Sequence, residues 1–131
     1  MLGCVEAIRK LCELGADINT RDKGGRTPLW AAACNGHAET IPTLGELGAN
    51  INTPDNEGLT PVYAAAYDNK IEAIRALGEL GADLNTSECQ GCTPMHVAAQ
   101  HNYGEAIRAL CEFGADINIA DNQGGTPVYA A

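Results

Sequence analysis

Cys89 and Cys92 form the one C-x-x-C pair of the chain, a spacing found in zinc sites and in redox-active dithiols. A structural zinc site normally has four ligands, usually with a second pair at a set spacing, and the sequence contains no second pair. The nearest histidines, His96 and His101, fall by register in a predicted helix rather than beside the thiols. We therefore expect no metal at this pair, and a redox pair stays open as the alternative.

Carboxylates are the second group that could do chemistry, and they recur in two rows. The rows are Glu6, Glu39, Glu72 and Glu105, and Glu13, Glu46, Glu79 and Glu112. A general acid and base in a glycosidase lie about 5–9.5 Å apart, whereas packed helices are already about 8–10 Å apart. Arg9, Arg75 and Arg108 lie three residues after one row and four before the other. This spacing predicts salt bridges along a solvated helix face, each worth about 0.2–0.5 kcal/mol.

The sequence contains no motif for nucleophilic catalysis or for nucleotide binding. Ser87 is the only serine, and no G-x-S-x-G surrounds it. Neither G-x-x-x-x-G-K-[ST] nor G-x-G-x-x-G occurs in the chain. We expect no catalytic residue, no cofactor and no metal, and hence no enzyme activity within residues 1–131.

The charge balance narrows the class of partner. The formal net charge of −9 argues against nucleic acid and against anionic membranes, which attract clusters of Lys and Arg. No run approaches the roughly 18 apolar residues of a membrane span. We expect a protein partner, no nucleic acid and no membrane insertion.

The six cysteines do not read as a disulfide framework. Cys12 and Cys111 share one register but belong to copies of a repeat that lie far apart along the chain. A disulfide needs a Cα separation of about 4.4–6.8 Å, which that arrangement does not allow. Cys4, Cys34 and the C-x-x-C pair occupy other registers. Reduced thiols in an intracellular, cytoplasmic protein are therefore expected.

The sequence contains an internal repeat, and the helices and loops of that repeat must position all these residues. Thr-Pro recurs at a 33-residue interval, and so does a closing Gly-Ala-Asp/Asn. The Thr-Pro pairs begin at Thr27, Thr60, Thr93 and Thr126. A fixed period of this length indicates one stacked array over residues 1–131. It comprises full repeats 22–54, 55–87 and 88–120, flanked by partial repeats 1–21 and 121–131.

The stretches TPLWAA, TPVYAA, TPMHVA and TPVYAA resemble the T-P-L-H-x-A motif of the ankyrin repeat family. The resemblance implies an all-α solenoid of stacked helix-turn-helix units with projecting β-hairpin fingers. It also implies a partner-binding concave face formed by the fingers and the first helix of each repeat. In this family the asparagine that closes each repeat can be hydroxylated. The matching residues here are Asn19, Asn52, Asn85 and Asn118.

Local signals place the helices. Threonine caps and proline opens helix one of each repeat, and Gly36, Asn69 and Asn102 end it because they tolerate φ > 0. Pro42 falls inside the predicted helix two, so a shortened or kinked first turn is expected there. Mid-helix glycines, at positions 45 and 78, are each expected to cost about 0.5–1 kcal/mol relative to alanine. The repeat that carries Pro42 is expected to be the weakest.

One register carries a ladder of rings where the family motif has histidine: Trp30, Tyr63, His96 and Tyr129. Two interpretations are open. In the first, each ring packs near the base of a finger with its polar tip bonded to backbone or threonine. Alternatively, the rings form a partly exposed aromatic stripe that a partner contacts.

The best partner-binding candidates are positions that change while their surroundings repeat, on the fingers and at the end of helix one. They are Lys23, Arg26, Trp30, Asn35, Asn56, Glu57, Leu59, Tyr67, Asp68, Gln90, Gln100 and His101. Tyr67 is the first-ranked aromatic anchor and Trp30 the second. The predicted function is a non-enzymatic protein–protein interaction module, within a monomeric segment of a longer array. The alternative is a structural spacer or a regulatory segment of a longer multidomain protein.

Overall fold

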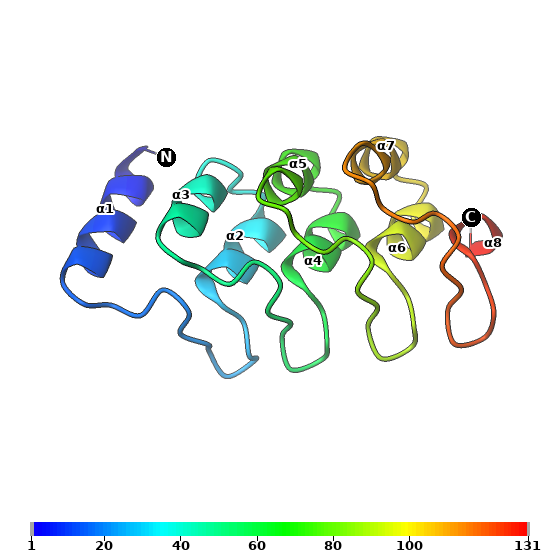
Figure 1. The fold of residues 1–131 in the computed structure, drawn as a ribbon, viewed down its shortest axis with the longest axis horizontal. Helices are drawn as coiled ribbons and strands as arrows, with labels where there is room; N and C mark the ends of the chain where they lie inside the picture. Colours follow the sequence, from blue (N-terminus) through cyan, green and yellow to red (C-terminus); the bar gives the residue numbers. More distant parts are fainter. Residues whose placement is uncertain (1, 131) are drawn as a thin grey trace.

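The computed structural model describes the backbone of residues 2–130 and the side chains of residues 5–128. The described chain is all-helical and contains no strand (Figure 1). Its helices are α1 (Leu2–Glu13), α2 (Pro28–Asn35), α3 (Ile41–Glu46), α4 (Pro61–Tyr67), α5 (Ile71–Glu79), α6 (Pro94–Gln100), α7 (Gly104–Glu112) and α8 (Pro127–Ala130).

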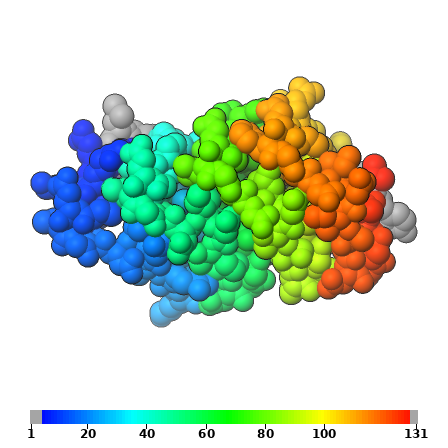
Figure 2. All heavy atoms as spheres, in the orientation of Figure 1, coloured from blue at the N-terminus to red at the C-terminus, as the bar shows by residue number. Residues whose placement is uncertain are grey.

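The helices form two rows, and loops project from the array beyond the second row (Figure 1). Helices α1, α3, α5 and α7 follow one another in the first row, and α2, α4, α6 and α8 in the second. The projecting loops, here called fingers, comprise residues 22–26, 55–59, 88–92 and 121–125. They form one edge of the continuous body seen in the space-filling view (Figure 2). The predicted all-α solenoid is confirmed.

The core runs along the whole stack between the two rows. Leucine and isoleucine from helix two, such as Leu44, Ile74 and Leu77, are fully buried against the alanines of helix one. The alanines have small side chains, so neighbouring helices approach closely and the interior packs densely. Each repeat therefore buries its apolar surface against the next one, as a solenoid requires.

The predicted boundaries of helix one are confirmed. The hydroxyl groups of Thr27 and Thr60 accept hydrogen bonds from the third residue of α2 and α4, at 3.1 and 3.2 Å. Proline occupies the first turn in both. At the other end, Gly36, Asn69 and Asn102 have φ values of 74°, 57° and 59°. The left-handed backbone at these positions turns the chain back toward helix two.

The fingers are not the expected β-hairpins. In the finger of the second full repeat, two backbone hydrogen bonds close the loop: the N–H of Asp55 donates to the carbonyl of Leu59 at 2.9 Å, and the N–H of Gly58 donates to the carbonyl of Asp55 at 3.0 Å. The Asp55 carboxylate accepts the N–H groups of Glu57 and Leu59, each at 2.9 Å. Because the carboxylate satisfies these amides, the loop closes without a ladder of paired strands. Asp22, Glu88 and Asp121 act in the same way in their own fingers.

Pro42 shortens helix two of its repeat, as expected, but it does not lie in the helix interior. Helix α3 begins at Ile41, so proline stands in its first turn, where no N–H is needed. A helix that began earlier would place the proline ring against the carbonyl of Ala38, four residues before it. Helix α3 consequently has 6 residues, whereas α5 and α7 have 9 each.

The mid-helix glycines have a packing role that the sequence expectation missed. A Cβ atom on Gly45 would lie 2.9 Å from Cδ1 of Leu80 in the next repeat. A Cβ atom on Gly78 would overlap the ring of Phe113, again one repeat further on. The absence of a Cβ at these glycines therefore leaves room for the side chains of Leu80 and Phe113 from the next repeat. The packing contacts of these two side chains offset the low helix propensity of glycine.

Candidate partner-binding face

The fingers and the ends of helix one share one side of the array, here called the finger face. It comprises the four fingers and residues 34–35, 67–68 and 100–101. A hollow of about 360 Å³ shows that these two parts adjoin, because it is lined by residues of the last two fingers and by Gln100 at the end of α6. The lining is polar, with Gln90, Gln123 and Asn122 among its members.

Repeats that carry a finger meet at three junctions, numbered here in chain order: 22–54 with 55–87, 55–87 with 88–120, and 88–120 with 121–131. At the first junction, Asn56 ties two fingers together: its side-chain amide donates to the carbonyl of Lys23 and its N–H to that of Gly24, both at 2.9 Å. The indole N–H of Trp30 donates to the carbonyl of Leu59 at 2.8 Å. Three hydrogen bonds therefore close this junction on the finger side.

The third junction repeats the arrangement. The side-chain amide of Asn122 donates to the carbonyl of Cys89, and its N–H to that of Gln90, both at 3.0 Å. The Nε2 atom of His96 donates to the carbonyl of Gly125 at 2.9 Å. Because Nδ1 of His96 accepts the N–H of Thr93 at 3.1 Å, the imidazole proton lies on Nε2. The same register thus holds a ring N–H at both junctions.

The second junction lacks these ties. Cys89 stands where the neighbouring fingers have asparagine, and within the described residues no hydrogen bond joins the fingers 55–59 and 88–92. Tyr63 occupies the ring position, and no hydrogen bond connects its hydroxyl to the following finger. Away from the fingers the junction is closed, because the side-chain Oδ1 of Asn85 accepts the N–H of Asp116 at 2.7 Å. The two repeats are therefore held together without a hydrogen bond between their fingers.

An aromatic cluster spans the same junction. The rings of Tyr67 and His101 meet edge to face, with centroids 5.2 Å apart, and His101 stacks on Tyr103 at 5.2 Å. Nδ1 of His101 is bonded to the carbonyl of Val97 at 2.9 Å, which fixes the orientation of the imidazole. Tyr67 is 53% exposed. Tyr103 was not among the predicted site residues, although its register changes from His37 through Lys70 to Tyr103.

The ladder of rings follows the packing interpretation where the structure describes it. Trp30 is 6% exposed, so its ranking as the second aromatic anchor is wrong. Its indole is held by the next finger, and the guanidinium of Arg26 lies 4.6 Å from the ring centroid. His96 is fully buried, and Tyr63 is half-buried. Burial, with the charge of Glu88, raises the pKa of Tyr63 to about 12. The side chain of Tyr129 lies outside the described residues.

The other predicted site residues are distributed as follows. Those with exposed side chains are Lys23, Arg26, Asn35, Asn56, Glu57, Asp68, Gln90, Gln100 and His101, and Leu59 is half-buried. The amide of Asn35 is bonded to the carbonyl of Ala31 in its own helix, at 2.9 Å. Asp68 accepts the thiol of Cys34 at 3.1 Å. Burial and this carboxylate together raise the pKa of Cys34 to about 11.

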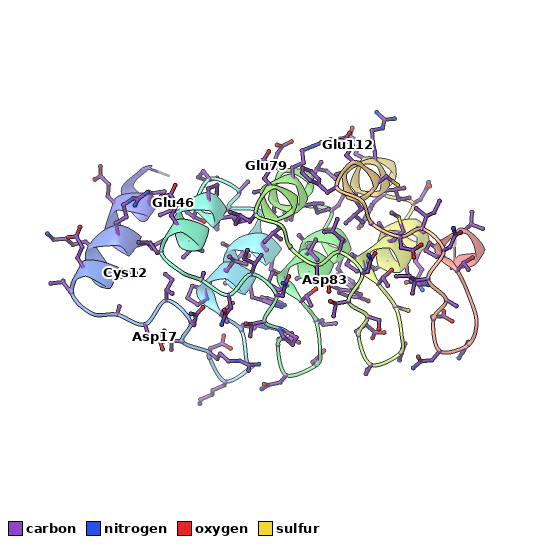
Figure 3. The ribbon with its side chains drawn as sticks, viewed as in Figure 1. Cys12, Asp17, Glu46, Glu79, Asp83 and Glu112 are labelled. Atoms are coloured by element: carbon purple, nitrogen blue, oxygen red, sulfur yellow. The ribbon has the colours of Figure 1, made fainter. Side chains whose placement is uncertain are left out.

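Glu46, Glu79 and Glu112, three carboxylates of one row, lie on α3, α5 and α7, away from the fingers (Figure 3). The predicted arginine–glutamate pairs within one helix are not found among the described residues. The arginine pairs join neighbouring repeats instead. Arg9 pairs with Glu46 at 2.7 Å, and Arg75 pairs with Glu112. An extended arginine side chain is long enough to bridge the about 8–10 Å between the axes of packed helices, so its guanidinium reaches the carboxylate of the next repeat. At the equivalent place opposite Glu79 stands Pro42, which has no charge.

The thiols show no metal or disulfide arrangement among the side chains that the structure describes. Cys12, Cys34, Cys89, Cys92 and Cys111 are free. No group of three His, Cys, Asp or Glu within residues 5–128 could hold a metal ion. Burial and the carboxylates of Glu88 and Asp121 raise the pKa of Cys92. A raised pKa lowers the thiolate fraction of Cys92 and with it the reactivity of that thiol.

Apolar side chains are exposed at the two ends of the stack. Leu11 lies on α1 and Leu14 directly follows it, and Ile117 and Val128 lie at the other end. The last two border an apolar hollow of about 410 Å³ beside α6, α7 and α8. These surfaces belong to the ends of the array and not to the finger face. No helix in the described part of the chain is long and apolar enough to cross a membrane.

Comparison with known families supports the architecture. A family model described as ankyrin repeats in three copies matches residues 1–88, and a second, described as ankyrin repeats in many copies, matches residues 79–129. No curated protein matches the chain.

Proposed function

The chain belongs to the ankyrin repeat family, and from this premise we propose that it is a non-enzymatic module that binds a protein partner on its finger face. Ankyrin repeats are generally protein–protein interaction modules. The finer part of the proposal, the face, is argued from the side chains below.

The observation that supports the proposal is the exposure and fixed orientation of the Tyr67 side chain. Its ring is more than half exposed, yet it is held against His101, which is itself fixed by a backbone carbonyl and by Tyr103. A large aromatic side chain that is already oriented loses little conformational entropy when a partner covers it. Tyrosines with these properties are frequent anchors of protein interfaces.

The two sides of the array also differ in how their charges are used. Along helix two, arginine and glutamate pair between repeats in the same way at Arg9–Glu46 and Arg75–Glu112. On the finger face the charge changes from basic at Lys23 to acidic at Glu57. A surface that varies from repeat to repeat can discriminate among partners, whereas a repeated row of ion pairs cannot.

Binding by this module would be a rigid presentation of a preformed surface. The continuous core between the helix rows holds successive repeats in one register. The side chains of the finger face therefore keep their relative positions before and after binding. A partner does not have to order the surface that it contacts, so more of the contact energy appears as affinity.

Hydrogen exchange on the complex with a captured partner tests the proposal. The chain is used as bait, the partner is purified, and amide exchange is compared with and without it. We expect protection in residues 55–69 and 88–103, and little change in α5 and α7. Protection confined to helix two would contradict the finger face. A spacer or regulatory segment of a longer protein, the alternative function, would yield no partner that protects the finger face at all.

A further inference from the structure

We propose that the second junction receives a cationic side chain, above all arginine, from a segment of the partner protein. This inference rests on the proposed function and specifies the chemistry of the partner. It follows from three features that coincide at this one junction: unoccupied hydrogen-bond acceptors, uncompensated carboxylates and the oriented ring of Tyr67.

The acceptors are finger carbonyls. At the first junction the carbonyls of Lys23 and Gly24 accept the two donors of Asn56, and at the third those of Cys89 and Gln90 accept the donors of Asn122. The equivalent carbonyls at the second junction belong to the second full repeat, at positions 56 and 57. Within the described residues they receive no hydrogen bond from the next finger. Two adjacent acceptors suit a guanidinium, which offers five N–H donors in a fixed plane.

The negative charge of the second junction favours a cationic side chain over an anionic one. The second junction has the carboxylates of Asp55, Glu57 and Glu88, of which Asp55 is buried, and its fingers and helices α4 and α6 contain neither lysine nor arginine. Asp68 accepts the thiol of Cys34 and therefore lies at the first junction. The basic side chains of Arg26 and Lys70 act on Cys34, which belongs to the first junction. A cationic partner group would therefore meet complementary charge here, whereas an anionic group would be repelled.

The ring of Tyr67 supplies the third feature. A guanidinium within about 6 Å of an aromatic centroid is attracted by the negative face of the ring. The chain already contains such a contact at the first junction, where Arg26 lies 4.6 Å from the centroid of Trp30. In the second full repeat the equivalents of Arg26 and Trp30 are Leu59 and Tyr63, so this contact has no counterpart there. Tyr67 follows Tyr63 on the same helix α4 and is 53% exposed, so its ring is open to a guanidinium from outside the chain. An arginine from the partner would provide the contact that the chain itself does not.

The probe that tests this is a short glycine- and serine-flanked peptide with a single arginine, titrated into the full chain labelled with ¹⁵N. Matched peptides carry glutamine or glutamate in place of arginine. We expect the arginine peptide to shift the backbone amides of residues 56–58, 67–68, 88–90 and 101. Its affinity should exceed that of the glutamine peptide by at least about fivefold, the scale of one interface anchor. Equal affinities for the arginine and glutamine peptides, or shifts elsewhere, would overturn the proposal.

Cys89→Asn is the decisive variant, because it restores the residue that closes the first and third junctions. It should tie the two fingers, raise the melting temperature and lower the affinity for the arginine peptide by about fivefold or more, without a change of charge. Cys89→Ser is the matched control, since it removes the thiol but is too short to tie the fingers. It should bind the peptide as the parent does. Unchanged binding by Cys89→Asn, with the fingers shown to be tied, would refute the site.

The experiments distinguish a failure of this inference from a failure of the proposed function. If a captured partner protects the finger face but Cys89→Asn binds it as well as the parent, the inference fails and the proposed function stands. If the captured partner protects helix two instead, the proposed function fails, whatever the peptides show.

Discussion

Tyr67 and His101 lie across the second junction with their ring centroids 5.2 Å apart and their planes at 64°. The pair has a counterpart one repeat earlier, where the Cys34 thiol meets Asp68 at 3.1 Å. Both contacts run from the end of one helix to the first residue after the helix in the next repeat. The register is thus constant, while its chemistry changes from thiol and carboxylate to two rings. This change is what makes the second junction distinct.

Leu77→Ala should destabilise the array strongly. Leu77 is 0% exposed in the middle of the stack, and truncating a buried leucine costs about 2–5 kcal/mol. Leu11 provides a matched control, because it has the same register in the first partial repeat but is 56% exposed. Urea unfolding of both alanine variants measures the difference. Equal losses would mean that burial between repeats is not what stabilises the fold.

Gly78→Ala should also be destabilising, against its helix propensity. Alanine would normally gain about 0.5–1 kcal/mol in a helix, but the added Cβ would overlap the ring of Phe113. Gly104→Ala is the control, since a Cβ there meets no atom within 4 Å. Thermal unfolding should show a lower midpoint for the first variant and an equal or higher one for the second. A stabilised Gly78→Ala would show that Phe113 moves aside easily.

Pro42→Arg should stabilise modestly. The gain does not come from a restored helical hydrogen bond, because position 42 lies in the first turn of α3. It comes from an ion pair with Glu79, equivalent to Arg75 with Glu112, and exposed pairs contribute about 0.2–1 kcal/mol. The gain should vanish in the double variant Pro42→Arg with Glu79→Gln. A midpoint below that of the parent would show that α3 requires proline in its first turn.

Tyr63 should make the folded state sensitive to alkaline pH. Its pKa rises from 10.0 to about 12 on folding, because burial disfavours the phenolate. A group whose pKa is raised in the folded state stabilises it fully below the unfolded pKa, and this contribution is lost as pH rises through the folded pKa. Between pH 10 and pH 12, the parent should therefore lose stability more steeply than Tyr63→Phe. Parallel curves from chemical unfolding at each pH would contradict this assignment.

The features that are local in sequence could be predicted. The threonine caps, the left-handed Gly36 and Asn69, and the short helix at Pro42 each depend on a few neighbouring residues, so the repeat period and turn chemistry indicated them. The solenoid architecture could be predicted from the repeat period, because each repeat buries the same positions.

The features that join repeats could not be predicted. Whether Trp30 is exposed depends on a carbonyl 29 residues away at Leu59. The partner of Arg9 is a carboxylate 37 residues away rather than one in its own helix. The finger closure by Asp55 replaces strand pairing that the family resemblance had implied. In each case the outcome depends on the distance between stacked elements, which a linear pattern does not contain.

The central claim is that the partner docks on the finger face, and paired substitutions on opposite sides of the array test it most directly. Figure 3 shows Glu79 on α5, on the edge away from the fingers. With a captured partner, Tyr67→Ala should weaken binding by at least about 1–2 kcal/mol, whereas Glu79→Ala should stay within about 0.5 kcal/mol of the parent.

Both variants must first melt like the parent, and Tyr67→Phe, which keeps the ring, should retain most of the affinity. Isothermal titration calorimetry on the four proteins gives the comparison. The account predicts that only Tyr67→Ala loses affinity; a greater loss for Glu79→Ala than for Tyr67→Ala would place the binding surface on helix two and contradict it.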